Sequence, residues 1–312
     1  MNLRGTIPND RSPIVSMEGS FMRKGLLRSI SLTLAFVLVS TFAVTSPAHA
    51  TLAWSGFSGT MAPGASMTKR WNNTLPNAVY RVGLAPVGAS TSADCEFEVT
   101  NQWYDRLSSG EREFYYTIKN IGSISCGTNI LVSRISASSV QSTGGVEPGE
   151  IKTYSTQLTQ LGPVSEVPLL GVLPSGATSA NPCRFKVLRS WYQRVRQGDV
   201  ARPVYLRYEV QNTGNIACSA DVQMGLAEVE YQYSAKSVGA GATTGTRIGA
   251  EPDTATHLIA LSPVENGCSV EVTRQFYRQY VSSSGTSGRE FVWYMKNLGT
   301  TTCSAERMVS RI

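Results

Sequence analysis

Apolar and polar residues alternate along three similar stretches of the chain. In the first stretch, Phe114, Tyr116 and Ile118 occupy one set of alternate positions, while Thr117 and Lys119 occupy the other. The same alternation occurs at Leu206, Tyr208 and Val210, and again at Phe291, Trp293 and Met295. A period of two is typical of half-buried β-strands. No stretch after residue 50 shows a convincing amphipathic helical pattern, so we expect an all-β fold.

Each alternating stretch ends in the motif Asn-x-Gly, and a cysteine follows the asparagine after six residues. The asparagines are Asn120, Asn212 and Asn297, and the cysteines are Cys126, Cys218 and Cys303. Another cysteine precedes each stretch, at Cys95, Cys183 and Cys268, and these starts lie 88 and 85 residues apart. We interpret the chain as three tandem immunoglobulin-like antiparallel β-sandwich repeats of about seven strands, at 51–135, 136–227 and 228–312. The glycine of each motif is expected to supply a turn at positive φ.

The six cysteines are expected to form one disulfide in each repeat. The repeat reduces the many formal pairings to Cys95–Cys126, Cys183–Cys218 and Cys268–Cys303. If the cysteine strand pairs with the Asn-x-Gly strand, the start of one lies beside the end of the other, near the second cysteine. Each bridge closes a loop of 31 to 35 residues and contributes about 3–4 kcal/mol in the chain-entropy model. No Cys-x-x-Cys pair is present, so we expect neither a metal site nor a cofactor.

The first 50 residues have the pattern of a signal peptide. The basic residues Arg23, Lys24 and Arg28 precede an apolar stretch, which ends at the small-x-small sequence Ala48-His49-Ala50. This stretch is too short and too interrupted for a stable span of about 20 residues. We therefore expect residues 1–50 to be removed and the remainder to be secreted, to the extracellular space or the cell envelope, without a stable membrane span.

Charged residues make up 16% of the chain, compared with about 25% in a typical soluble domain. The formal net charge is +6, but the predicted leader carries half of it, which leaves about +3. Because no long Lys/Arg run accompanies this small surplus, we expect no nucleic-acid partner.

Imidazole-based catalysis would have to use His257, because the other of the two histidines, His49, leaves with the predicted leader. His257 aligns with Tyr80 and Pro168 of the other repeats, and we interpret it as a residue on a strand surface. The sequence contains no Gly-x-Ser-x-Gly elbow and no recognisable group of acids. We therefore predict a protein that is not an enzyme. The alternatives are a secreted carboxylate-dependent glycoside hydrolase and a secreted inhibitor or effector.

An aromatic residue followed by tyrosine occurs in all three repeats and is the main candidate for a binding surface. The candidate residues are Trp103, Tyr104 and Arg106; Trp191, Tyr192 and Arg194; and Phe276, Tyr277 and Arg278. Adjacent strand residues face opposite ways, so one ring of each pair is expected to point outward. Aromatic faces with a nearby arginine suit sugar stacking or a cation–π contact. The competing interpretation, which we favour, places one ring in the sandwich core and the other under a loop.

A cysteine strand, an aromatic strand ending in Asn-x-Gly, and a Pro-Gly turn follow one another in this order. The residues are Tyr116-Thr-Ile-Lys-Asn120-Ile-Gly122, Tyr208-Glu-Val-Gln-Asn212-Thr-Gly214 and Glu147-Pro-Gly-Glu150. This arrangement resembles bacterial extracellular immunoglobulin-like repeats, in particular the adhesion-related module called CARDB. The resemblance implies a spacer, adhesin or carbohydrate-proximal role, with a cell-surface glycan or protein as partner, and it implies no catalytic residues. The disulfides depart from the usual pattern of that module.

In that family the repeating unit begins at the cysteine strand. In this chain the strands that follow residue 50 begin half a unit earlier, before the first cysteine strand. On this division residues 268–312 lack their last strands, and residues 51–86 correspond to those strands without a partner. We hypothesise that the N-terminal segment completes the C-terminal half-domain, because open strand edges must be paired. Within one molecule this gives a closed pseudo-threefold assembly. Between molecules it gives a fibre that self-associates by strand complementation.

Overall fold

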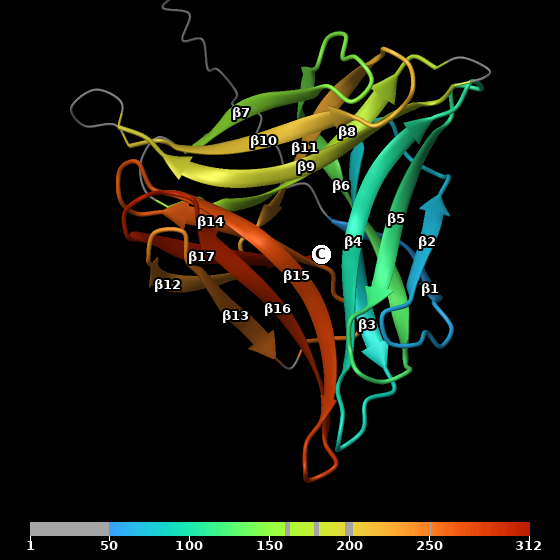
Figure 1. The fold of residues 1–312 in the computed structure, drawn as a ribbon, viewed down its shortest axis with the longest axis vertical. Helices are drawn as coiled ribbons and strands as arrows, with labels where there is room; N and C mark the ends of the chain where they lie inside the picture. Colours follow the sequence, from blue (N-terminus) through green and yellow to red (C-terminus); the bar gives the residue numbers. More distant parts are fainter. Residues whose placement is uncertain (1–49, 160–162, 178–180, 197–201, 250) are drawn as a thin grey trace, which may run out of the picture. The chain divides into compact units, whose positions relative to one another are not determined.

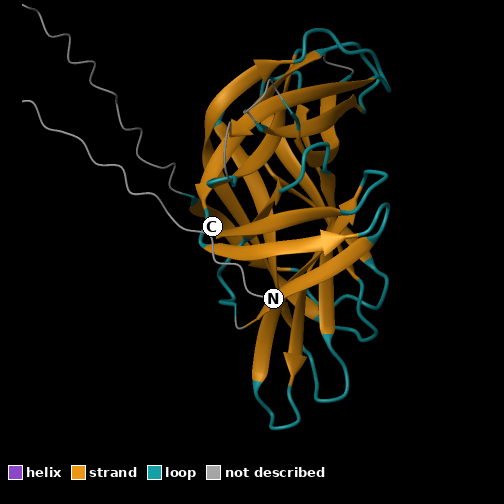
Figure 2. Ribbon diagram, turned by 90° about the vertical axis from the view of Figure 1, so that its left-hand side faces the viewer, coloured by secondary structure: helices purple, strands orange, loops and turns teal. Residues whose placement is uncertain are grey.

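In the computed structural model, the described part of the chain is built of antiparallel β-strands and contains no helix (Figure 2). The structure describes residues 50–159, 163–177, 181–196, 202–249 and 251–312. All of them belong to one compact unit. The all-β prediction is therefore confirmed. The predicted signal peptide, apart from residue 50, lies outside the described residues.

The strands fall into three groups along the chain. The first group contains β1 (Thr51–Phe57), β2 (Ser66–Trp71), β3 (Ala78–Val87), β4 (Cys95–Arg106), β5 (Arg112–Asn120) and β6 (Gly127–Ser142). The second contains the end of β6 with β7 (Ile151–Thr159), β8 (Glu166–Ser175), β9 (Cys183–Arg194), β10 (Val204–Asn212) and β11 (Ser219–Glu228). The third contains β12 (Tyr231–Val238), β13 (Thr243–Gly249), β14 (His257–Pro263), β15 (Ser269–Val281), β16 (Ser287–Asn297) and β17 (Cys303–Arg311).

The strands of each group pair in the same order. In the first group, β1 and β3 flank β6, while β2 and β4 flank β5. In the second, the end of β6 and β8 flank β11, while β7 and β9 flank β10. In the third, β12 and β14 flank β17, while β13 and β15 flank β16. Each group therefore consists of six paired strands, where the sequence led us to expect about seven.

A nine-stranded sheet joins the three groups, because β4, β9 and β15 also pair with one another at their ends. The end of β4 pairs with the start of β9, where Tyr104 lies opposite Phe185. The end of β9 pairs in the same way with the start of β15. The end of β15 pairs with the start of β4, where Tyr277 lies opposite Phe97. The three strands thus form a closed triangle around a common centre (Figure 1).

The N-terminal strands do not complete the C-terminal group. Strands β1 and β3 pair with β6, and β2 pairs with β5, so residues 51–87 belong to the first group. The third group has strands of its own in the corresponding places, namely β12, β13 and β14. The hypothesis of completion within one molecule is therefore wrong. Local pairing satisfies these edges, and the ring closes through β4, β9 and β15. Self-association between molecules stays a prediction.

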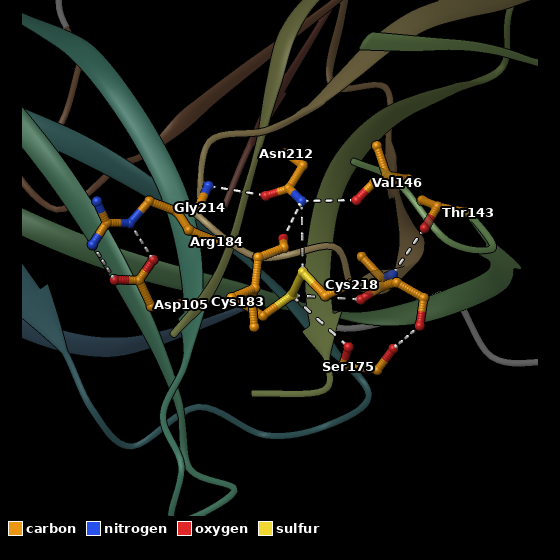
Figure 3. The surroundings of a disulfide bond; sticks show 12 residues. Asp105, Thr143, Val146, Ser175, Cys183, Arg184, Asn212, Gly214 and Cys218 are labelled. Atoms are coloured by element: carbon orange, nitrogen blue, oxygen red, sulfur yellow. Dashed lines mark hydrogen bonds and ion pairs between the residues drawn. A yellow bond between two sulfur atoms is a disulfide. The ribbon is translucent and has the colours of Figure 1, made fainter. Parts of the chain in front are cut away.

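The three disulfides are those predicted: Cys95–Cys126, Cys183–Cys218 and Cys268–Cys303. The asparagine of the Asn-x-Gly motif lies beside each bridge, as Figure 3 shows for Asn212. The Nδ2 atom of Asn212 donates to the carbonyl oxygens of Val146 (2.9 Å) and Ile216 (2.8 Å), and its Oδ1 atom accepts from the N–H of Gly214 (2.9 Å). Corresponding bonds are made by Asn120 and Asn297. In every group, therefore, a buried asparagine amide with its hydrogen bonds made stabilises the turn beside the disulfide.

The glycines of the three motifs do not adopt positive φ, which corrects the expectation from sequence; they are Gly122, Gly214 and Gly299. A Cβ atom on Gly214 would lie 3.1 Å from the carbonyl oxygen of Pro182 and 3.2 Å from the amide nitrogen of Arg184. These atoms belong to the backbone that leads into β9. Glycine is therefore favoured here because the backbone of a neighbouring segment approaches closely, and not because of its conformational freedom.

Candidate functional site

The tyrosine of each predicted aromatic pair is buried; these residues are Tyr104, Tyr192 and Tyr277. The hydroxyl group of Tyr104 accepts a hydrogen bond from the backbone N–H of Tyr80 at 2.9 Å. In the second group, Pro168 occupies the place of Tyr80 and has no N–H to donate. The hydroxyl group of Tyr192 therefore donates instead to the carbonyl oxygen of Ile259 at 3.3 Å. One ring of each pair is thus a core residue whose hydroxyl group is satisfied.

The other ring of each pair points away from this interior. Trp103 and Trp191 are half-buried, and Phe276 is buried. Arginine side chains cover these rings, with Arg184 at 6.0 Å from Trp103, Arg189 at 4.8 Å from Trp191, and Arg274 at 5.0 Å from Phe276. The arrangement of aromatic ring and arginine therefore exists, but the arginines come from positions other than those predicted.

The three predicted arginines serve the junctions between strands. Arg194 is buried and donates to the carbonyl oxygens of Arg202, at 2.6 Å, and of Pro263. Arg278 forms ion pairs with Asp94, at 3.3 Å, and with Glu290. Arg106 lies partly exposed at the end of β4, opposite the backbone of Arg112 and Cys183. The nine predicted residues do not form one surface; only Trp103, Tyr104 and Tyr192 line the pocket described below.

His257 is fully buried in β14, so its interpretation as a residue on a strand surface is wrong. Every residue of β14 is buried, because both faces of this strand are covered. The Nε2 atom of His257 lies 3.0 Å from Oε2 of Glu251, and its ring stacks on Phe291 with a centroid distance of 4.7 Å. Burial lowers the pKa of His257, although the hydrogen bond to Glu251 opposes this effect. Its backbone N–H donates to the hydroxyl group of Tyr277 at 3.0 Å.

A pocket of about 440 Å³ lies at the centre of the triangle formed by β4, β9 and β15. The three strands pair only at their ends, and their middle residues line the pocket. The floor comes from β3, β8 and β14 and includes the side chains of Arg81, Leu169 and Leu258. Polar groups from β4 and β9, including Asn101, Gln102 and Ser190, are also part of the lining.

A β-bulge interrupts each of these three strands at the same place. The pairing shifts between Val99 and Asn101 in β4, between Val187 and Arg189 in β9, and between Val272 and Arg274 in β15. The extra residues are Thr100, Leu188 and Thr273, and all three line the pocket. A bulge bends the strand and disrupts its pairing locally. The bulges interrupt pairing with β5, β10 and β16, and they bend β4, β9 and β15 beside the opening at the centre of the sheet.

Arg81 is the charged residue of the floor. Its backbone pairs with Ser133 of β6, just as Leu258 pairs with Ser310 of β17, so the two side chains occupy corresponding places. The Nη2 atom of Arg81 donates to Oε1 of Gln275 at 2.7 Å, whereas its Nε atom is buried without a hydrogen-bond partner. Burial lowers the pKa of Arg81, but a guanidinium group remains charged in proteins.

The rim of the pocket carries Lys186, Arg189 and Glu271. Arg189 makes two hydrogen bonds to the carboxylate of Glu209, at 3.1 and 2.9 Å, outside the pocket lining. Burial raises the pKa of Glu271, while Arg189 and Lys296 oppose this effect. With Arg189 paired to Glu209, the charged side chains that remain in the described lining are Arg81, Lys186 and Glu271.

One group of potential metal ligands occurs among the described residues: Glu265, Cys268 and Cys303. Both sulfur atoms belong to the third disulfide. A cysteine binds a metal ion as a free thiolate, so with both sulfur atoms in a disulfide this group does not fit a metal ion. The expectation that the protein needs no metal or cofactor stays a prediction.

The pocket was not predicted from the sequence, because it lies where three groups meet and pairing between the groups was not expected. One signal was available. The aligned strands before each first cysteine place Arg81 against Leu169 and Leu258, so one repeat has a cation where the other two have leucine.

Comparisons with family models, with curated proteins and with solved structures gave no match. The resemblance to CARDB modules therefore stays a prediction. The three disulfides are consistent with an oxidising compartment. Within the described ranges, no helix is long and apolar enough to cross a membrane.

Proposed function

We propose that the chain is an exported, non-catalytic protein of three immunoglobulin-like repeats, which binds a glycan in its central pocket. The observation that supports this proposal is the pocket itself, about 440 Å³ in volume, at the point where β4, β9 and β15 meet. This volume lies in the range of small-molecule sites, which is about 300–1,000 Å³. A role in adhesion or surface structure would use the same pocket to hold a cell-surface glycan.

The lining offers the groups that sugar hydroxyls require. Asn101, Gln102 and Ser190 combine hydrogen-bond donors and acceptors. The indole N–H of Trp103 is buried and has no hydrogen-bond partner. The Trp103 ring itself stacks on Tyr115 at a centroid distance of 5.1 Å, so its face is largely occupied. Recognition would therefore depend on hydrogen bonds more than on stacking.

Glu271 favours a second candidate, a carboxylate-dependent glycoside hydrolase. Its raised pKa suits a general acid. Hydrolysis by this mechanism requires two carboxyl groups about 5–10 Å apart. The described lining of the pocket contains only this one, so binding without turnover is the better supported function.

A glycan array probed with the purified protein tests the proposal, and tryptophan fluorescence then measures the affinity of each hit. Asn101→Ala should weaken binding several-fold, because it removes one polar contact. Asn72→Ala is the control, since Asn72 is exposed and lies outside the lining. Release of reducing ends from polysaccharides, abolished by Glu271→Gln, would instead support the hydrolase. An array without any hit would rule out glycan binding.

A further inference from the structure

Arg81 occupies a place that leucine fills in the two other groups. Leu169 and Leu258 are 7% and 3% exposed, so an apolar side chain of similar length packs well at this position. The packing of the fold therefore does not require arginine here. Arg81 itself is half-buried, with its Nε atom buried and without a partner. Partial burial of a guanidinium costs free energy unless its charge is paired, so the cation of the first group calls for another explanation.

No carboxylate among the described residues forms an ion pair with Arg81, and its one hydrogen bond is to the neutral Gln275. The ionisable side chain that interacts electrostatically with Arg81 is Tyr277. Burial raises the pKa of Tyr277, so its phenol is neutral and does not balance the charge of Arg81. The guanidinium of Arg81 therefore places in the pocket floor a positive charge with which no described carboxylate forms an ion pair.

Two side-chain amides beside Arg81 turn their oxygen atoms toward the protein. The Oε1 atom of Gln275 accepts from Arg81, and the Oε1 atom of Gln102 accepts from the backbone N–H of Val82 at 3.3 Å. The NH₂ groups of both residues remain as donors, and both residues line the pocket. A cation flanked by donors fits a ligand group that only accepts hydrogen bonds.

We propose that the central pocket binds an acidic sugar, whose carboxylate pairs with the guanidinium of Arg81. The inference rests on the proposed glycan binding and specifies its ligand. Arginine presents a planar fork of donors that matches a carboxylate, and the sugar hydroxyls meet Asn101 and Ser190. Lys186 adds positive charge at the rim. The charge of the rim carboxylate, Glu271, is partly offset by the neighbouring cations Arg189 and Lys296.

The test uses methyl β-D-glucuronide and methyl β-D-glucoside, which differ in the carboxylate alone. Affinities are measured by titration calorimetry for the wild-type protein, for Arg81→Leu and for Lys69→Gln. Leucine is the residue of the other two groups, so Arg81→Leu should fold and keep its Tm or raise it. Lys69→Gln removes the same unit charge at an exposed position outside the lining.

We expect the wild-type protein to bind the glucuronide at least tenfold more tightly than the glucoside. Arg81→Leu should lower the affinity for the glucuronide about 10- to 100-fold and leave the glucoside unchanged, while Lys69→Gln changes neither. Equal affinity for both sugars, or a glucuronide affinity that survives Arg81→Leu, would overturn the role of the carboxylate and leave glycan binding intact. If neither sugar binds while neutral glycans bind on the array, the acidic ligand is wrong and the proposed function stands. If no glycan of either kind binds, both are wrong.

Discussion

The carboxylate of Asp105, at the end of β4, accepts two hydrogen bonds from the guanidinium of Arg184, at the start of β9, at 2.7 and 2.9 Å (Figure 3). These two residues are also partners in the strand register. At the junction of β15 and β4, the same positions hold Arg278 and Glu96, with the charges reversed. At the third junction the same positions are uncharged, with Gln193 opposite Ser269. The three junctions therefore differ from one another, and like charges would meet if the strands paired in another order.

Removing one partner of the Asp105–Arg184 pair should destabilise the fold. Asp105 is buried, whereas the Arg184 side chain is 41% exposed, so we expect Asp105→Ala to lower the free energy of unfolding by only about 1–2 kcal/mol. Urea denaturation measures the change. The double exchange of Asp105→Arg with Arg184→Asp should recover part of the loss, because the opposite charges meet again. Equal stability of the single variant and the exchanged pair would contradict this account.

Gly83 should not tolerate a side chain. It lies in β3, and a Cβ atom at this position would come within 2.9 Å of the Cα atom of Thr256, which belongs to the third group. The neighbouring atom is backbone and cannot move aside, so Gly83→Ala should cost about 1–3 kcal/mol of unfolding free energy. Gly145→Ala is the matched control, since nothing lies within 4 Å of its Cβ position. A Tm equally unchanged in both variants would show that the strands do not approach this closely.

The buried pair of His257 and Glu251 should make stability depend on pH. Burial lowers the pKa of His257 in the folded protein, so the unfolded chain takes up a proton more readily. The free energy of unfolding should therefore fall, by roughly 1 kcal/mol, as the pH decreases from about 7 to about 5 through the ordinary histidine pKa of about 6.5. His257→Gln should flatten this dependence, because no other histidine follows residue 50. Denaturation curves at several pH values provide the measurement, and an unchanged slope in the variant would exclude His257 as its source.

Asn212→Ala should destabilise the second group. The substitution leaves the carbonyl oxygens of Val146 and Ile216 without the Asn212 donor, and the N–H of Gly214 loses its acceptor. Unsatisfied buried polar groups cost about 1–3 kcal/mol, which a lower Tm would report. The disulfide should still form, so the variant should show no free thiol. Asn72→Ala, at an exposed position, should leave the Tm unchanged.

The repeated pattern made much of the fold predictable from sequence. Alternation at Phe114, Tyr116 and Ile118 predicted a strand because one face of β5 is buried in the sandwich. The spacing of the cysteines predicted their pairing because the bridges are local to each group. Pairing between groups was missed, since the ends of β4, β9 and β15 carry no pattern that distinguishes a partner in another repeat from one in the same repeat. The assignment of residues 51–86 failed for the same reason.

The candidate site was predicted less well. The aromatic pairs were found because aromatic residues stand out in a weakly charged sequence, and their tyrosines occupy the core, as the favoured interpretation expected. The burial of His257 was missed because it depends on a second layer that covers β14. The bulges at Thr100, Leu188 and Thr273 are single extra residues, which strand alternation alone cannot separate from a loop. Arg81 could have been found by asking where one repeat departs from the other two.

The closed triangle also bears on the order in which the protein folds. During synthesis the first group emerges long before the third, and Glu98 of β4 meets Arg274 of β15 across 176 residues of sequence. Until then the start of β4 presents an unpaired edge to the surroundings, and so does the end of β9, which also pairs with β15. Contacts of such long separation slow folding, so the last junction to form should set the rate. Nascent chains that end before β15 would then expose this edge to chaperones or to one another.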